Sequence, residues 1–121
     1  MMQMTLWPEE NVVYVNPEVI EKLGMPRHVQ LRINDSQKMV VLRACNANEK
    51  HSIIIPSIPM IQFEVSGRKL LEHITEMMGW NDNRPRVIEG VYVPAKELIA
   101  FDLENAELAE LENEEESYGQ S

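Results

Sequence analysis

The residues best suited to nucleophilic or metal chemistry are few and widely spaced in this chain of 121 residues. There is one cysteine, Cys45, and the three histidines are His28, His51 and His73. An isolated cysteine is more often a small apolar residue than a nucleophile, and a closed metal site normally takes four ligands. The sequence also lacks a glycine-rich phosphate loop and a nucleophile elbow. We therefore expect a protein that is not an enzyme, with no catalytic residue, no metal site and no cofactor.

Basic side chains stand at the entries and on the strands of two predicted hairpins. They belong to Arg27, His28, Arg32, Arg43, Arg84 and Arg86. If a twofold axis relates the two hairpins, it gathers these residues into one basic rim, which would contact phosphates or an acidic protein surface. Charges on exposed strands also solvate a domain and protect its sheet edges, so a purely structural role stays open.

The net charge of −9 is concentrated at the C-terminal end. Residues 1–101 contain 12 acidic and 11 basic residues, which gives −1. Residues 102–121 contain the other 8 acidic residues and no basic one, which gives −8. Arguments about the attraction or repulsion of nucleic acid must therefore treat the body and the tail separately.

The acidic tail, residues 104–121, combines carboxylates with two leucines. Its candidate partner-binding residues are Leu108, Leu111, Glu112, Glu114, Glu115 and Glu116. Like charges four residues apart oppose a free helix, so we expect the tail to be flexible and disordered in isolation. It either folds against a basic groove of a partner, shields the basic rim of its own chain, or only adds solubility.

The first part of the body predicts a strand, a short helix and a hairpin. Residues 12–15 form an apolar strand. Asn16 and Pro17 provide the start of a helix, and Gly24 provides its end. Residues 29–42 alternate as two strands around a polar turn.

The second part predicts the same order of elements after a connection with a short strand at residues 53–55. Residues 61–65 alternate as a strand, and Ser66 is a plausible N-cap for a helix that Gly79 ends. Residues 87–103 predict another hairpin. Residues 1–10 read as a short arm.

These observations predict an α+β fold in a single domain, residues 1–103, built from two strand–helix–hairpin units at residues 12–43 and 61–103. Residues 26–43 align with residues 84–101 without a gap at an offset of 58, which suggests an internal duplication, with chance similarity as the alternative. The predicted shared core consists of Val29, Leu31, Val40, Leu42, Val87, Val91, Leu98 and Phe101.

Within residues 12–43, Pro17, the Leu23-Gly24 pair and the hairpin resemble the swapped-hairpin domain of AbrB-type transcription regulators and MazE-type antitoxins. In that family two chains interleave into a barrel that grips DNA, so the resemblance implies a similar barrel built from two repeats of one chain. The match covers about a quarter of the sequence. The spacing from Pro17 to Gly24 is one residue shorter than usual, and a mixed Glu21-Lys22 pair replaces the basic residue of DNA-binding members. These departures weaken the expectation of DNA binding more than that of the fold.

The layout of the whole chain is similar in style to small accessory proteins of bacterial mobile elements and phages, which include antitoxins and anti-CRISPR inhibitors. We expect a protein-binding inhibitor of a nucleic-acid-handling machine, whose partner has a basic groove. The alternative is an AbrB/MazE-like DNA-binding regulator or antitoxin, and a homodimer stays open. No apolar run approaches the roughly 18 residues that cross a bilayer, and the first ten residues contain no base. We therefore expect a cytoplasmic protein without membrane contact.

Overall fold

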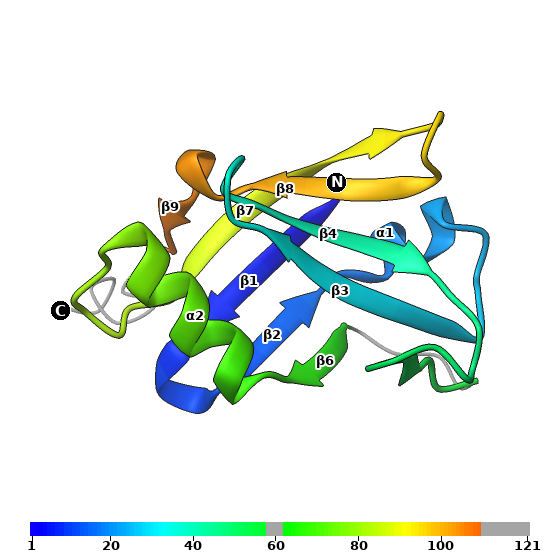
Figure 1. Ribbon diagram of the computed structural model, residues 1–121, viewed down its shortest axis with the longest axis horizontal. Helices are drawn as coiled ribbons and strands as arrows, with labels where there is room; N and C mark the ends of the chain where they lie inside the picture. Colours follow the sequence, from blue (N-terminus) through cyan, green and yellow to red (C-terminus); the bar gives the residue numbers. More distant parts are fainter. Residues whose placement is uncertain (58–61, 110–121) are drawn as a thin grey trace, which may run out of the picture.

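The computed structural model describes residues 1–57 and 62–109, which form a coiled antiparallel sheet with helices packed on it (Figure 1). The strands are β1 (Gln3–Trp7), β2 (Val12–Val15), β3 (His28–Asn34), β4 (Met39–Ala44), β5 (Ile53–Ile54), β6 (Phe63–Ser66), β7 (Arg86–Val93), β8 (Leu98–Asp102) and β9 (Glu107–Leu108). The helices are α1 (Pro17–Lys22), α2 (Arg68–Met78) and the 3-10 turns η1 (Pro8–Glu10) and η2 (Leu103–Asn105). In the described part of the chain, neither α-helix has the length and apolarity that crossing a membrane requires.

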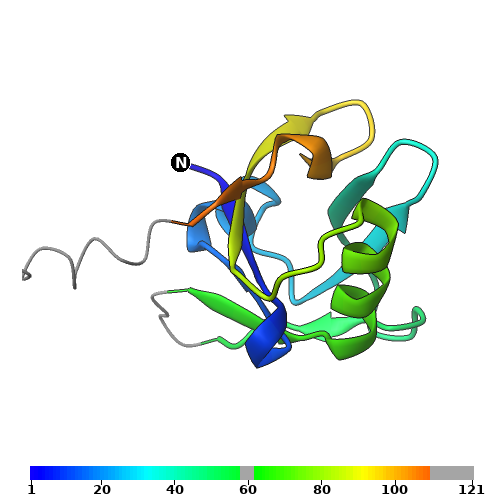
Figure 2. The same ribbon diagram turned by 90° about the vertical axis from the view of Figure 1, so that its left-hand side faces the viewer.

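One continuous sheet connects these strands in the order β5-β3-β4-β8-β7-β1-β2-β6, with β9 attached to β7. The sheet curls until it is nearly closed, as two perpendicular views show (Figures 1 and 2). β7 joins its two halves, because residues 86–89 pair with β1 and residues 90–93 pair with β8. The barrel-like shape therefore depends on how β7 passes from one half to the other.

Local sequence determines where the helices begin and end. Pro17 occupies the first turn of α1, where the backbone N–H that proline lacks would have no helical partner. Gly24 follows α1 with a φ of 89°, and Gly79 follows α2 with a φ of 72°. Glycine adopts this left-handed conformation without a Cβ clash, which confirms both predicted helix ends. Each helix buries two apolar side chains against the inner face of the sheet.

The inner face of the sheet carries the core, which is tightest at Gly90. Val40, Phe101 and Gly90 lie opposite one another on β4, β8 and β7. A Cβ on Gly90 would lie 2.7 Å from Cε2 of Phe101, so the buried ring occupies the space that a side chain would fill. Packing therefore requires the glycine, since the φ of Gly90 lies outside the left-handed region.

The predicted α+β fold of two strand–helix–hairpin units is wrong. The described strands make one antiparallel sheet that is nearly closed, and the helices of 6 and 11 residues only cover it. The fold is therefore mostly β. The periodicity of the sequence predicts α2 correctly, but a helix of three turns does not form a layer of its own against the nine described strands.

Two strands lie where the sequence predicted none. Residues 1–10, expected to be an arm, contain β1, which lies between β7 and β2 and fully buries Met4 and Leu6. Residues 107–108, expected to belong to the tail, form β9 on β7. β7, which pairs with both strands, is distant from β1 in sequence, whereas β2, the other partner of β1, follows after four residues. The hairpin of β1 and β2 is therefore a local feature that the sequence analysis missed. A smaller correction concerns α2, whose N-cap is Gly67 and not Ser66.

The predicted core is correct in the first hairpin, and in the second it is displaced by one residue except at Phe101. The predicted residues that are fully buried are Val29, Val40, Leu42 and Phe101, and Leu31 packs against them in part. Val87 and Leu98 are half-buried and Val91 is 64% exposed, because Ile88 and Ile99 face the core instead. A shift of one residue reverses every side chain of a strand. The offset of 58 therefore aligns inward positions with outward ones, and that alignment is wrong.

We expect Gly90→Ala to lower the free energy of unfolding by about 1–3 kcal/mol, because the new methyl group overlaps the side chains of Phe101 and Ile99. Urea unfolding followed by circular dichroism measures the change. Gly67→Ala is the matched control, since its Cβ would meet the nearest atom at an ordinary 3.6 Å. Phe101→Leu should cost less in the Gly90→Ala chain than in the wild type. Equal stability of Gly90→Ala and the wild type would contradict the packing argument.

Candidate protein-binding surface

The outward face of β3, β4, β8 and β7 carries a row of side chains that begins with a cation and ends with an exposed apolar residue. Arg32 on β3 lies opposite Val41 on β4. Val41 lies opposite Ala100 on β8, which lies opposite Val91 on β7. Directly opposite residues share one face of a sheet, so these four side chains form a continuous row.

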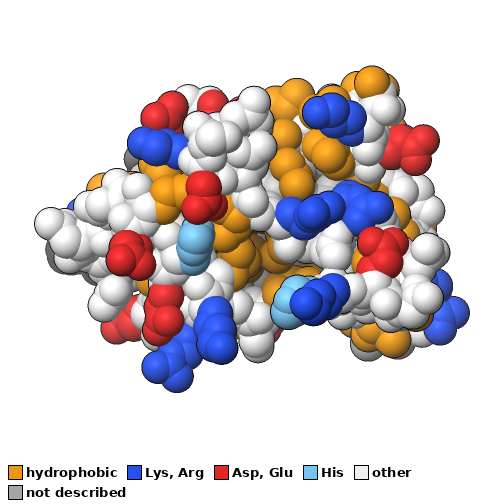
Figure 3. Space-filling view, viewed as in Figure 1, with side chains coloured by type: hydrophobic (Ala, Val, Ile, Leu, Met, Phe, Trp, Pro, Cys, Tyr) orange, Lys and Arg blue, Asp and Glu red, His pale blue; other side chains and the backbone are white. Residues whose placement is uncertain are grey.

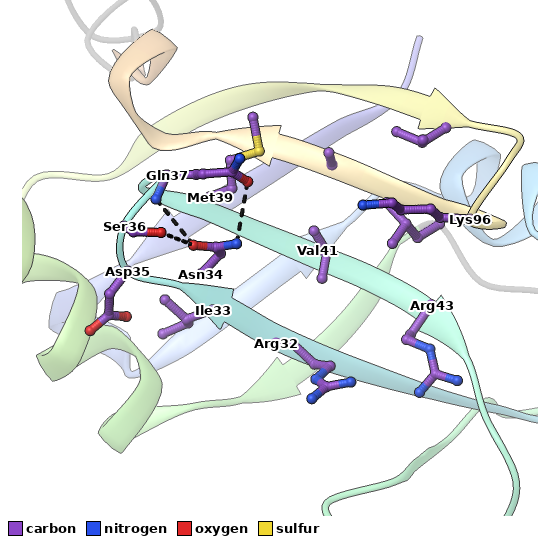
Figure 4. Close-up of a pocket in the computed structure, with 13 residues that line it drawn as sticks. Arg32, Ile33, Asn34, Asp35, Ser36, Gln37, Met39, Val41, Arg43 and Lys96 are labelled. Carbon is purple, nitrogen blue, oxygen red and sulfur yellow. Dashed lines mark hydrogen bonds between the residues drawn. The ribbon is translucent and has the colours of Figure 1, made fainter.

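A second row runs parallel to the first on the same face. Gln30 lies opposite Arg43, Arg43 opposite Leu98, and Leu98 opposite Val93. Arg32 and Arg43 are consequently diagonal neighbours on adjacent strands, and their side chains lie side by side in Figure 4.

Apart from Val91 and Gln30, the residues of the two rows line an open hollow of about 640 Å³, which we call the Arg32 groove (Figure 4). Its lining includes Arg32, Arg43, Lys96, Met39, Val41 and Leu98. Figure 3 shows apolar side chains next to Lys and Arg side chains on this face. The groove therefore offers an apolar floor with a cationic border.

The cations of the groove differ in how they are paired. Nη1 of Arg43 donates to Oε1 of Gln30 at 2.8 Å and to Oε1 of Glu49 at 3.1 Å. Hydrogen bonds from the Asn46 backbone and from Arg43 lower the pKa of Glu49. Arg32 and Lys96 form no ion pair with any residue that the structure describes. Their charges are therefore open to an anionic ligand.

The turn between β3 and β4 closes one end of the groove. Oδ1 of Asn34 accepts hydrogen bonds from Oγ of Ser36 at 2.9 Å and from the backbone N–H of Gln37 at 3.1 Å. Asp35, the acidic residue of the lining, lies 3.0 Å from Nε2 of His73 on α2. α2 lies beside this turn (Figure 2). The turn is thus held in place, and its carboxylate already has a partner.

A second hollow, of about 680 Å³, lies between β1, β7 and the residues that follow β8. Glu89, Glu104 and Glu107 line it, and we call it the acidic hollow. Val91 also lines this hollow, while its cross-strand neighbour Ala100 lines the Arg32 groove. The acidic hollow and the groove are therefore adjacent surfaces of opposite charge.

The structure does not gather the predicted basic residues into one rim, so that arrangement is wrong. Arg27 and His28 lie at the start of β3, where His28 pairs with Ile54 of β5. Arg84 and Arg86 lie at the start of β7, at the opposite side of the molecule in Figure 1. Of the six predicted residues, Arg32 and Arg43 line the groove. The predicted rim depended on the alignment of the two hairpins, and the observed pairing of the strands contradicts that alignment.

Arg86 is held within the fold. Its guanidinium lies 4.3 Å from the ring centroid of Trp80 and donates to both carboxylate oxygens of Asp82, at 3.1 and 3.2 Å. The hydrogen bonds from Arg86, and one from the backbone of Arg84, lower the pKa of Asp82. Arg86 therefore holds the segment before β7 in place, and few of its N–H groups remain free to bind a partner.

The predicted tail residues are only partly covered by the structure. Leu108 lies in β9, opposite Arg86, with 41% of its surface exposed. Leu111, Glu112, Glu114, Glu115 and Glu116 lie outside the described residues. Sequence reasoning missed Lys96 and the apolar floor of the groove as surface features. The alternation that contains Val91 and Val93 was visible, but the sequence did not show which set faces outward.

Nucleophilic chemistry has little support in the described residues. Burial raises the pKa of the Cys45 thiol, and nearby Glu49 adds to this effect, which disfavours the reactive thiolate. Within residues 1–57 and 62–109, no three His, Cys, Asp or Glu side chains lie close enough together to hold a metal ion.

Comparisons of the chain with models of protein families, with curated proteins and with solved structures give no match. The argument for function therefore rests on these surfaces.

We expect Asp82→Asn to destabilise the fold near neutral pH and to have less effect in acid. The pKa of Asp82 is lowered in the folded state, so its contribution is present above about pH 4 and disappears as the pH falls through the folded-state pKa. Urea midpoints from about pH 7 to about pH 2 measure the difference between variant and wild type. Glu76→Gln, on an exposed face of α2, is the control. A difference that stays constant with pH would contradict the role of the Asp82–Arg86 pair.

Proposed function

We propose that this chain is a non-enzymatic binding protein that occupies the basic groove of a nucleic-acid-handling protein and thereby inhibits it, as anti-CRISPR proteins do. The observation that carries this proposal is the acidic hollow, which Glu89, Glu104 and Glu107 line together. In the sequence, Glu104 and Glu107 lie just before the acidic residues 110–116. In the phosphate-binding groove of a partner, these carboxylates would take the place of the phosphate groups of a nucleic acid. In this proposal the protein acts in the bacterial cytoplasm.

The anchoring of β9 supports this proposal, because it fixes where the acidic segment leaves the body. Glu107 pairs with Val87 on β7, and the backbone N–H of Ala109 donates to the carbonyl of Pro85 at 3.0 Å. The carboxylates of the hollow are thus presented from strands and short turns. Groups that are already positioned lose less conformational entropy on binding than groups on a free chain.

The second candidate is a DNA-binding regulator of the AbrB and MazE kind, and the Arg32 groove favours it. Arg32 and Lys96 are unpaired within the described residues and could contact phosphates. The apolar side chains that line the groove are all non-aromatic, so none of them can stack on bases. Arg84 and Arg86 do not line the groove, and the guanidinium of Arg86 is already engaged by Asp82 and Trp80. DNA binding therefore ranks behind protein binding.

We expect the tagged full chain to retain a protein from bacterial lysate after nuclease treatment. Glu89→Gln together with Glu107→Gln should lower the affinity for the retained protein about two- to thirtyfold, because each exposed ion pair contributes about 0.2–1 kcal/mol. The loss should shrink as salt rises, since screening removes the attraction that these two carboxylates provide. Affinity capture with quantitative mass spectrometry measures both effects.

The control for this experiment is Glu21→Gln together with Glu76→Gln, which changes the net charge equally at exposed positions on α1 and α2. An equal loss with this control would mean that net charge alone governs capture. Loss of the retained protein on nuclease treatment, with tight binding of duplex DNA by fluorescence anisotropy at physiological salt, would favour the DNA-binding regulator instead.

A further inference from the structure

We infer that two copies of the chain form a twofold-symmetric dimer, in which the Arg32 groove of each copy faces the acidic hollow of the other. The dimer concerns the isolated protein, so it stands or falls independently of the inhibited target. One consequence does rest on the proposed function: the dimer covers the acidic hollow, so a target has to compete with the second copy for that surface.

The groove and the hollow meet on β7, which makes the surface self-complementary. Val91 lines the hollow, whereas Val93 and the cross-strand neighbour Ala100 line the groove. Val91 and Val93 share the outward face of the strand. A twofold axis along this boundary places the groove of each copy opposite the hollow of the other. One axis therefore makes both contacts at once and closes the assembly at two copies.

The groove supplies two cations without an anionic partner in the part of the chain that the structure describes. Arg32 on β3 and Lys96 in the turn between β7 and β8 both line the groove (Figure 4), and neither belongs to an ion pair there. Side chains of this kind can lay their aliphatic stems on an apolar floor while the charged ends extend outward. Both cations can therefore reach a second copy.

The hollow supplies two carboxylates that are likewise unpaired within residues 1–57 and 62–109. Glu89 on β7 and Glu107 on β9 form no ion pair among these residues. The third carboxylate, Glu104, lies 3.9 Å from Nζ of Lys38. Two carboxylates of one copy therefore match the two cations of the other, and the symmetry repeats this match.

The charges of opposite sign inside each surface already have partners. Asp35 in the groove lies next to His73, and the terminal ammonium of Met1 in the hollow pairs with Glu18. Each chain has a net charge of −9, which opposes association. At physiological ionic strength the screening length is about 8 Å, so the charges nearest the contact matter most. Those charges attract.

An exposed apolar side chain lies at the boundary where the axis passes. Val91 is 64% exposed, and in the dimer it meets Val91 of the second copy. Ala100 and Val93 beside it are half-buried. Covering these side chains removes apolar surface from water, at about 25 cal/mol per Å². Ionic contacts alone would leave this surface exposed.

The combined surface has the size that an interface requires. The groove is lined by 13 residues and the hollow by 10. Together they match the roughly 20–30 residues that each partner contributes to a standard interface. A contact through the groove or the hollow alone would be smaller. The twofold arrangement, which uses both, is therefore favoured over a contact that uses one.

Charge reversal tests these contacts in the isolated protein. Glu89→Lys together with Glu107→Lys places like charges opposite each other in both contacts. We expect the dissociation constant of the dimer to rise roughly tenfold or more, because attraction is replaced by repulsion. The variant changes the net charge from −9 to −5, which by itself would favour association. Sedimentation velocity at micromolar to millimolar protein and physiological salt measures the change.

The complementary variant is Arg32→Glu together with Lys96→Glu, which should also dissociate the dimer. An equal mixture of the two variants restores opposite charges in both contacts. We therefore expect a dimer in the mixture although neither variant forms one alone. Recovery in the mixture also shows that both variants are folded.

The control is Glu21→Lys together with Glu76→Lys, which changes the net charge equally at exposed positions on α1 and α2 and should leave the dimer intact. A wild-type chain that is monomeric at all these concentrations would overturn the proposal. A dimer that withstands both reversals, a mixture that stays monomeric, or species that grow beyond two copies would overturn it as well.

Cross-linking locates the axis. In a Cys45→Ser background, Val91→Cys should give a disulfide-linked dimer with oxidised glutathione, because the two copies of position 91 lie close together. Lys69→Cys, at an exposed position on α2 outside both surfaces, should stay monomeric. Cross-linking at position 91 that is no greater than at position 69 would overturn the twofold arrangement.

Discussion

The buried ring of Phe101 rests against the backbone of Gly90, and the closure of the sheet depends on this contact. β7 holds the two halves together by pairing with β1 through residues 86–89 and with β8 through residues 90–93. The ring sits where one pairing gives way to the other. A side chain on Gly90 would push β7 away from β8, and a close-packed interior has no room to absorb that displacement.

The same contact determines what the molecule shows to solvent. Side chains alternate along a strand, so with Ile99 and Phe101 turned inward, Leu98 and Ala100 must face out. On β7 the inward position of Gly90 places Val91 outside. The apolar floor of the Arg32 groove is therefore a consequence of how the core is packed. Surface and core follow from one register.

Local features could be predicted from the sequence, whereas pairing between distant strands could not. Pro17, Gly24 and Gly79 mark helix ends because their backbone preferences act within a few residues. β9 pairs with a strand about 20 residues away, and β1 joins its local partner β2 to a strand more than 75 residues away. The sequence identifies Arg32 and Arg43 as candidate binding residues. It does not show that Asp82 and Trp80 engage the guanidinium of Arg86, because these contacts depend on the fold. The predicted grouping of the basic residues is wrong because it depended on an alignment of the two hairpins that is wrong by one residue.

The positions of the charged residues in this chain matter more than the net charge. Residues 1–101 are nearly neutral, yet the body places a cationic groove next to an acidic hollow. The net charge of the whole chain therefore says little about which surface meets a partner, because a basic surface is attracted to the hollow and repelled by the groove.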